Sequence, residues 1–231
     1  MSAFAISVVV IALNEAATID ACLERVSVLL REDGPGEVVV SDGGSVDGTA
    51  VIAERYAPVV TAPRGRANGL NAGAARATGD VLLFLHADTR LPPRALTAIR
   101  DALADARVAG GRFRLAFDVQ SVGLRLTQRW INLRDALLGG YTGDQAVFVR
   151  RDVFERLGGF APLPLMEDLD FARRLGRAGR VVRLREVVVT SGRRWRRHGA
   201  LRTNLRMIVL RWLYYLGVPP GVLAPHYSDV R

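Results

Sequence analysis

The chain has 231 residues, a length typical of one domain or of one domain with an extension. Hydrophobic residues make up 49% and charged residues 24%, a globular composition that excludes a largely disordered, collagen-like or low-complexity protein. The single cysteine, Cys22, excludes an internal disulfide framework and a zinc site built from several cysteines. The first residues lack the basic start and the cleavage site of a secretory signal, so we expect none.

The positive charge is concentrated at the C-terminal end. All 32 basic residues are arginine, against 23 acidic residues, and the formal net charge is +9. Residues 193–231 hold eight of these arginines and one acidic residue, Asp229, whereas residues 1–192 are nearly balanced. The sequence therefore predicts a nearly neutral body with a basic C-terminal segment.

Buried strands and amphipathic helices alternate through the first half of the chain. The pattern predicts strands at 6–13, 38–40, 59–60 and 81–85, and helices at 16–31, 48–56, 67–77 and 92–107. This alternation is the signature of right-handed βαβ crossovers, so we expect an α/β fold with a mostly parallel sheet.

The second half of the chain is less regular. We expect strands at 111–117, 146–149 and 181–189, the first of them half-exposed, and helices at 121–138, 152–157, 167–178 and 199–216. The last helix carries an apolar stripe formed by Leu201, Leu205, Ile208, Trp212 and Leu216. We divide the chain into an α/β domain at 1–190 and a basic, amphipathic extension at 191–231.

Acidic side chains follow three of the predicted strands at the point where each strand ends. Ligands of parallel sheets bind beyond these ends, so Glu15, Asp42 and Asp88 are expected at one crevice. Divalent cations such as Mg²⁺ prefer carboxylate oxygens together with substrate phosphates, and Asp88 could supply such an oxygen. His86 would face the same side as Asp88 and could be a second ligand. In the alternative interpretation Asp42 and Asp47 are turn and N-cap residues and His86 is a buried histidine.

Several common sequence motifs are absent. The chain has no G-x-x-x-x-G-K-[ST] phosphate loop, no G-x-G-x-x-G after the first strand and no G-x-S-x-G nucleophile elbow. These absences weaken the hypotheses of a P-loop nucleotidase, a dinucleotide-binding enzyme and an α/β-hydrolase.

Five segments follow the order of the motifs of one known family. They are Ala12-Leu13-Asn14-Glu15, the Asp42-Gly43-Gly44-Ser45-Val46-Asp47-Gly48-Thr49 stretch, residues 65–80, His86-Ala87-Asp88, and Gly158-Gly159-Phe160 with Glu167-Asp168-Leu169-Asp170-Phe171. On these residues the chain resembles the family 2 glycosyltransferases, which have the GT-A fold. The wider pattern, with Gly143-Asp144-Gln145, is similar to a bacterial subgroup associated with radical-SAM and selenium-related domains.

The resemblance implies a nucleotide-sugar site, a metal and a general base. The donor-binding residues that it implies are Ala12, Asn14, Glu15, Asp42, Arg66, His86, Asp88 and Arg194. Asp88, with His86, would hold Mn²⁺ or Mg²⁺, and Asp168 would take the proton from the acceptor hydroxyl. The residues implied on the acceptor side are Asp144, Gln145, Glu167 and Trp195. Without the resemblance, the acidic residues near 168 could simply be favoured by the dipole of a helix N-terminus.

Two departures from the family pattern stand out. His86 replaces the first aspartate of the Asp-x-Asp motif, and Ala12 replaces a proline. The segment from Ser191 to Trp195 resembles the Gln-x-x-Arg-Trp motif of processive members but has serine in place of glutamine. We therefore do not predict a processive polymerase.

The function predicted from the sequence is a metal-dependent, inverting glycosyltransferase. It would move a sugar from a nucleotide diphosphate sugar, with UDP favoured over GDP, to an acceptor hydroxyl that could be lipid-borne. Two alternatives stay open: a nucleotidyltransferase of similar architecture, and a non-catalytic nucleotide-sugar-binding or membrane-scaffold protein.

Three interpretations of the basic segment compete. Its apolar stripe could pack on the body, or the segment could lie on an anionic membrane surface; nucleic-acid binding is the least favoured because no recognised motif accompanies the charge. Arg211 interrupts the apolar run, which is too short to cross a bilayer. We expect a cytoplasmic protein, with contact to the inner face of the plasma membrane as the open alternative.

Overall fold

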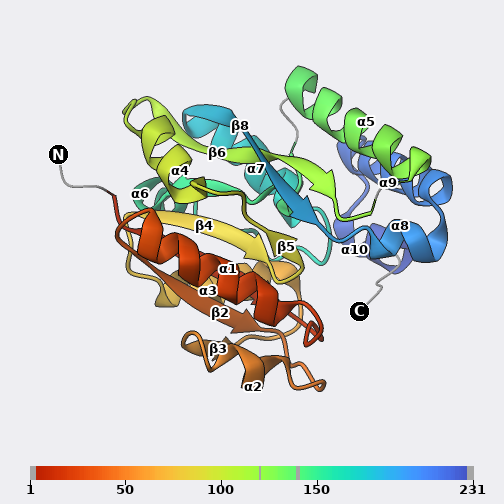
Figure 1. Cartoon of the computed structure of the whole chain (residues 1–231). Coiled ribbons are helices and arrows are strands. Elements are labelled where there is room, and N and C mark those ends of the chain that lie inside the picture. Colours follow the sequence, from red (N-terminus) through yellow and green to blue (C-terminus); the bar gives the residue numbers. More distant parts are fainter. Residues whose placement is uncertain (1–3, 120, 139–140, 228–231) are drawn as a thin grey trace.

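The computed structural model describes residues 4–119, 121–138 and 141–227. A central sheet of eight strands carries helices on both faces (Figure 1). The strands are β1 (Ile6–Ala12), β2 (Gly36–Asp42), β3 (Val59–Thr61), β4 (Val81–His86), β5 (Thr89–Arg90), β6 (Val108–Phe117), β7 (Phe148–Arg150) and β8 (Arg180–Thr190). The α-helices are α1 (Ile19–Glu32), α2 (Thr49–Ala53), α3 (Arg66–Arg76), α4 (Ala95–Leu103), α5 (Val122–Leu138), α6 (Arg151–Arg156), α7 (Glu167–Ala178), α8 (Arg193–His198), α9 (Ala200–Tyr215) and α10 (Pro220–Leu223). Two short 3₁₀ helices, η1 (Gly143–Gln145) and η2 (Ala224–His226), complete the described elements.

The strand order is β3-β2-β1-β4-β7-β6-β8-β5. The first four strands in this order are parallel to one another, β7 is antiparallel to both of its neighbours, and β8 is parallel to β6. The predicted α/β class with a mostly parallel sheet is thus confirmed. Ala12 pairs with Asp42 and Ile11 with His86, so the carboxyl ends of β1, β2 and β4 meet at one edge.

The two faces of the sheet bury alternate residues of the same strands, as the period of a β-strand requires. On β1, Val8 and Val10 pack with α1 and α4, whereas Val9 and Ile11 pack with α3 on the other face. Helix α3 lies so close to the sheet that a Cβ atom on Gly73 would collide with Val9. The continuous apolar runs that predicted doubly buried strands therefore have a direct structural reason.

Strand β6 differs from its prediction. We expected a half-exposed strand at 111–117, but β6 is mostly buried, so that expectation is wrong. Of the two alternating arginines that suggested exposure, Arg114 is exposed, whereas Arg112 points inward and forms a buried ion pair with Asp135 of α5. Leu124 of α5 also packs in one buried cluster with Leu115 and Phe117 of β6.

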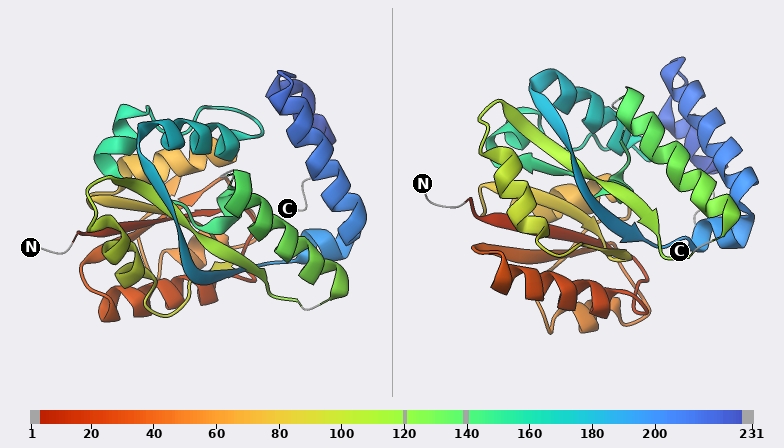
Figure 2. Two further views of the ribbon diagram at one scale, coloured as in Figure 1. Left: turned by 90° about the horizontal axis from the view of Figure 1, so that it is seen from above. Right: turned by 45° about the horizontal axis from the view of Figure 1, so that its top comes forward.

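The C-terminal helices follow the end of β8. Helix α8 was not predicted, and α9 lies beside α5: a Cβ on Gly123 would be 3.1 Å from Cβ of Ala200, and Asn204 donates a 2.6 Å hydrogen bond to Thr127. Figure 2 shows α5 and α9 close together at their first turns and diverging toward their other ends. No helix of the described chain is both long and apolar enough to span a bilayer. The division of the chain at residue 190 stays a prediction.

Candidate active site

The turn after β2 is built around Asp42. Its carboxylate accepts hydrogen bonds from the backbone N–H groups of Gly44 and Ser45 at 3.0 and 2.8 Å, and from the Ser45 hydroxyl. These bonds match the alternative interpretation of Asp42 as a turn residue. They also fix Gly43 beside the end of β1, where it lines a cavity.

The end of β1 is tied to the same turn by Asn14. Its backbone adopts a positive φ of 52°, its N–H donates to the Ser45 hydroxyl at 2.8 Å, and its side-chain oxygen accepts from the N–H of Val46 at 3.0 Å. Together the two turns form one wall of a cavity of about 150 Å³, which Ala12 and Gly43 line. Ala12 therefore faces a cavity, whereas Asn14 holds the shape of its wall.

Acidic side chains and one histidine gather at the ends of β1 and β4. Glu15 and His86 are buried, and Asp88 is mostly buried. His86 Nδ1 lies 3.5 Å from Asp144 Oδ1. Burial raises the pKa of Asp88 above its ordinary value, and the carboxylates of Glu15 and Asp144 act in the same direction. The electrostatic effects of His86 and Arg193 oppose this rise in the pKa of Asp88.

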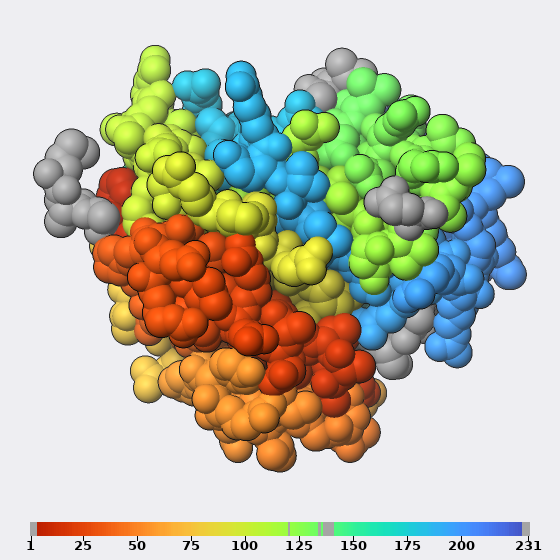
Figure 3. Space-filling model, viewed as in Figure 1, coloured from red at the N-terminus to blue at the C-terminus, as the bar shows by residue number. Residues whose placement is uncertain are grey.

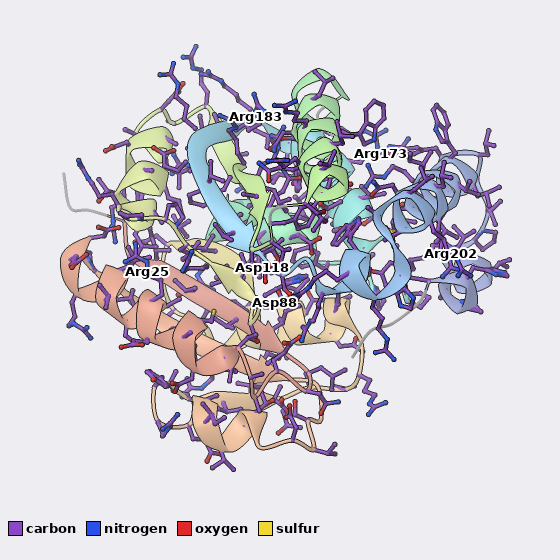
Figure 4. All side chains as sticks on the ribbon, turned by 45° about the vertical axis from the view of Figure 1, so that its right-hand side comes forward. Arg25, Asp88, Asp118, Arg173, Arg183 and Arg202 are labelled. Atoms are coloured by element: carbon purple, nitrogen blue, oxygen red, sulfur yellow. The ribbon has the colours of Figure 1, made fainter. Side chains whose placement is uncertain are left out.

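Arg193 joins two of these carboxylates, although the resemblance to the family implies no role for it. Its guanidinium forms an ion pair with Glu15 and lies 3.3 Å from Asp88. Arg193 is the first residue of α8. Asp118 holds the start of this helix, because it accepts a 2.8 Å hydrogen bond from the N–H of the preceding residue, Gly192. Figure 4 labels Asp88 and Asp118 near each other between the sheet and the C-terminal helices. The signal in the sequence is the Arg193-Arg194 pair shortly after β8, of which the resemblance implies a role only for Arg194.

A tyrosine near the C-terminus holds the two other arginines of the site. Tyr227 accepts hydrogen bonds from Arg66, at 3.3 Å, and from Arg194, and its ring lies 5.4 and 4.5 Å from the two guanidinium carbons. Arg66 also pairs with Glu167 at 2.5 Å. Although burial alone lowers the pKa of Arg66, Tyr227 and Glu167 raise it well above its ordinary value. No sequence motif indicated Tyr227, because it lies outside every segment that resembles the family.

Asp168 lies at the start of α7. One of its oxygens accepts a 3.0 Å hydrogen bond from the N–H of Gly143, and the other accepts from the N–H of Leu169 at 2.8 Å. Its side chain lines a cavity of about 310 Å³ that is mainly apolar. Burial lowers the pKa of Arg211, which lines the same cavity, while Asp168 opposes that shift.

Of the residues predicted on the acceptor side, two face the cavity and one is buried inside the protein. Asp144 and Trp195 line the cavity of Asp168. Trp195 packs on Phe117 with ring centroids 4.5 Å apart. Gln145 is fully buried and donates to Phe113 O and to Asp135 at 3.3 and 3.2 Å, so its side chain supports η1 from inside.

Three cavities share two arginines. Arg66 and Arg194 line the 310 Å³ cavity of Asp168, the 150 Å³ cavity of Ala12 and a smaller cavity of about 40 Å³ at Asp88. The three cavities therefore adjoin. The structure brings the predicted residues of β1, β4, α3, α7 and α8 to one cleft, in which Asp42 acts through the turn that it supports.

The small cavity at Asp88 holds the two carboxylates of Asp88 and Asp144 together with the positive charge of Arg193 and Arg194. Among the described residues, no group of three or more His, Cys, Asp or Glu side chains has the arrangement of a metal cage. Mg²⁺ sites commonly use one or two carboxylates, with waters and substrate phosphates as the remaining ligands. Asp88, which faces the small cavity with Asp144, fits that second arrangement.

Comparison with known proteins identifies the family. Residues 7–158 match the model of the family described as glycosyl transferase family 2. The chain belongs to this family. It is 32% identical over 206 residues to a PGL/p-HBAD biosynthesis glycosyltransferase of Mycobacterium tuberculosis, which covers 83% of this chain and 77% of that protein. The chain is accordingly a glycosyltransferase, and its narrower assignment to the radical-SAM-associated subgroup stays a prediction.

Solved structures of glycosyltransferases share the fold of this chain. The mannosyltransferase PcManGT of Pyrobaculum calidifontis, solved with GDP-Man and Mn²⁺, has a TM-score of 0.71 at 22% identity over 98% of this chain and 68% of its own. Glucosyl-3-phosphoglycerate synthase of Mycobacterium tuberculosis, solved with Mn²⁺, UDP and glucosyl-3-phosphoglycerate, has a TM-score of 0.67 at 24% identity over 94% of this chain and 81% of its own. These similarities support the predicted GT-A fold.

Proposed function

We propose that this glycosyltransferase is inverting and metal-dependent, and that it takes its sugar from a nucleotide diphosphate sugar. The observation that carries the proposal is the single cleft in which Arg66 and Arg194 connect the Ala12 cavity, the Asp88 cavity and Asp168. The nucleoside would occupy the Ala12 cavity and the diphosphate would lie along the two arginines. UDP is the favoured donor nucleotide, because the resemblance of the segment that begins at Asp42 to the family's Asp-Gly-Ser-x-Asp-Gly-Thr motif favours uridine.

Mn²⁺ or Mg²⁺ would be held by Asp88, with His86 and Asp144 beside it. When bound, the cation supplies Lewis acidity and neutralises the charge that develops on the leaving diphosphate. Two similar structures were solved with Mn²⁺ and a nucleotide or nucleotide sugar, which supports this part of the proposal. Arg193 and Arg194 contribute fixed positive charge to the same region.

Asp168 is the proposed general base. The acceptor oxygen attacks the anomeric carbon while the bond from that carbon to the diphosphate oxygen breaks, and the electron pair of that bond leaves with the diphosphate. The proton of the acceptor hydroxyl passes to the Asp168 carboxylate, whose orientation is held by Gly143. Attack from the side opposite the leaving group inverts the configuration of the sugar.

The acceptor is proposed to be amphiphilic, with a hydroxyl head and an apolar remainder such as a lipid. The support is the apolar lining of the Asp168 cavity, to which Leu165, Met207 and Ile208 contribute. The similar mycobacterial proteins are named for PGL/p-HBAD biosynthesis. We propose a cytoplasmic enzyme that works at the inner face of the plasma membrane.

Calorimetry with a set of UDP- and GDP-sugars, with and without Mn²⁺, tests the donor and the metal together. We expect binding of at least one UDP-sugar that requires the cation. In Asp88→Asn the affinity gained by adding Mn²⁺ should fall about tenfold or more, because a metal-bound carboxylate is replaced by a weaker neutral ligand.

The matched control is Asp101→Asn, an exposed carboxylate of α4 that lines none of the three cavities of the cleft. It should bind the donor as the original chain does. Cation-independent binding, or an unchanged Mn²⁺ effect in Asp88→Asn, would contradict the metal assignment.

A further inference from the structure

An apolar stripe runs along the outer side of α5. Its members, spaced as neighbours on one side of a helix, are between 50% and 66% exposed; they are Val122, Leu126, Trp130 and Leu133. Large apolar side chains of this exposure are unusual when they form a contiguous row on a monomeric surface. The row therefore has the character of an interaction surface.

Helix α9 carries a second stripe with the same spacing. Its members are between 54% and 77% exposed; they are Leu201, Leu205, Val209 and Trp212 of α9 and Leu216, the residue directly after its end. Four of these five belong to the stripe expected from the sequence to face the body or a membrane. The structure does not bury them, because α9 turns Thr203 and Leu210 inward instead.

The two stripes point to the same side of the molecule. Helices α5 and α9 run in the same direction, since Gly123 lies against Ala200 and Thr127 bonds to Asn204 one turn later. On each helix the stripe lies opposite the buried side, given about 100° of rotation per residue. In Figure 3 the green α5 segment and the blue C-terminal segment form one continuous flank of the molecule. We call the two stripes together the apolar flank.

The charges around the apolar flank are positive. Arg125 and Arg129 on α5 and Arg202 on α9 are exposed beside the stripes, and Figure 4 labels Arg202 at the outer side of the C-terminal helices. Residues 193–227 contain no acidic residue. The acidic residue of α5, Asp135, is fully buried against Arg112. The rim is thus complementary to an anionic surface.

The cavity of Asp168 opens at this flank. Trp130 of α5 and Trp212 of α9 line the cavity and are also exposed members of the two stripes. An apolar molecule embedded in a surface that covers the flank could enter between these two tryptophans. This continuity distinguishes the flank from an exposed patch remote from the site.

We propose that the apolar flank docks on an anionic lipid bilayer, with its leucines and tryptophans in the interfacial region and its arginines on the lipid headgroups. Amphipathic helices with basic rims bind membranes in this way, by adding apolar burial to electrostatic attraction. Docking places the mouth of the Asp168 cavity against the bilayer. The flank itself is independent of the proposed transfer chemistry, so the two proposals can fail separately.

Vesicle co-sedimentation of the full chain, without donor or metal, tests the docking surface. The vesicles contain either phosphatidylcholine alone or equal parts of phosphatidylglycerol and phosphatidylcholine, at low and at high salt. We expect strong binding to the anionic vesicles, weak binding to the neutral ones, and partial release by salt. Leu205→Glu should lower the vesicle affinity about tenfold or more, and Arg202→Gln about fivefold.

Matched controls carry the same chemical changes elsewhere on the surface. Val51→Glu alters an exposed valine of α2, and Arg76→Gln removes an exposed arginine at the end of α3. Both should bind anionic vesicles as the original chain does. Thermal unfolding followed by circular dichroism verifies that all four variants are folded.

Two results would overturn the proposal. One is equal binding of the original chain and of folded Leu205→Glu to anionic vesicles. The other is absence of binding of the original chain to anionic vesicles. If light scattering then detects a dimer that Leu205→Glu dissociates, the flank is covered by a second copy of the chain. Both vesicle results are obtained without donor or metal. A loss of donor binding in calorimetry would therefore contradict the proposed function but not the docking surface.

Discussion

The donor side and the acceptor side of the cleft are built by opposite means. On the donor side, Asp42, Asn14 and Ser45 are linked to one another and to the backbone by hydrogen bonds, where β1 and β2 end. On the acceptor side, the cavity of Asp168 is walled by apolar side chains of two helices that diverge from each other (Figure 2). A polar frame of fixed geometry suits recognition of a nucleotide, whereas an apolar wall with an exposed rim suits an amphiphilic acceptor.

Two polar connections hold these sides together. One is the buried ion pair between Arg112 of β6 and Asp135 of α5, which Gln145 also contacts. The other is Tyr227, which holds Arg66 of α3 and Arg194 of α8. Removing each connection separately shows how much the acceptor side depends on the sheet.

The largest expected effect comes from Asp135→Ala. The change leaves the Arg112 guanidinium buried without its carboxylate, and removing one partner of a buried pair costs about 3–5 kcal/mol of the free energy of unfolding. Urea unfolding followed by circular dichroism measures the loss. Asp152→Ala, which removes an exposed i,i+4 partner of Arg156, is the control and should cost less than about 0.5 kcal/mol. Equal midpoints for the two variants would show that the pair does not hold α5 to the sheet.

A smaller effect is expected from Tyr227→Phe. The ring stays in place, but the hydroxyl that accepts hydrogen bonds from Arg66 and Arg194 is lost. We expect donor affinity to fall about tenfold, because a hydrogen bond to a charged group contributes about 1.5–3 kcal/mol and part of it is recovered by water. Calorimetry with the UDP-sugar and Mn²⁺ gives the value. Tyr215→Phe on α9 is the control, and an equal loss in both variants would contradict the positioning role of Tyr227.

The sequence was informative where local pattern determines structure. Buried apolar runs located β1, β2 and β4, and the parallel order placed Glu15, Asp42 and Asp88 at the same edge. The same pattern failed at Arg112, because an arginine in an alternating strand looks exposed unless its buried partner is known. Asp135, which supplies that partner, lies on a different element.

The site was only partly predictable for a related reason. The sequence indicated Asp168 and Arg66 through motifs. It did not indicate Arg193 or Tyr227, whose contacts with Glu15 and with Arg66 span more than 100 positions. Gln145 was expected on the acceptor side, yet its carboxamide is used inside the protein. Burial and long-range pairing decide such roles, and neither is visible in the order of residues alone.

The most direct test of the single cleft is the separation of donor binding from transfer in Asp168→Asn. Calorimetry with a UDP-sugar and Mn²⁺ and a transfer assay are run on the same preparation. The control is Asp170→Asn, because Asp170 lies two positions after Asp168 on α7 and pairs with Arg174 one turn further along the helix. The account predicts unchanged donor affinity with transfer reduced by a factor of about 10² or more in Asp168→Asn, and near-normal transfer in Asp170→Asn. Unchanged transfer in Asp168→Asn would contradict the account.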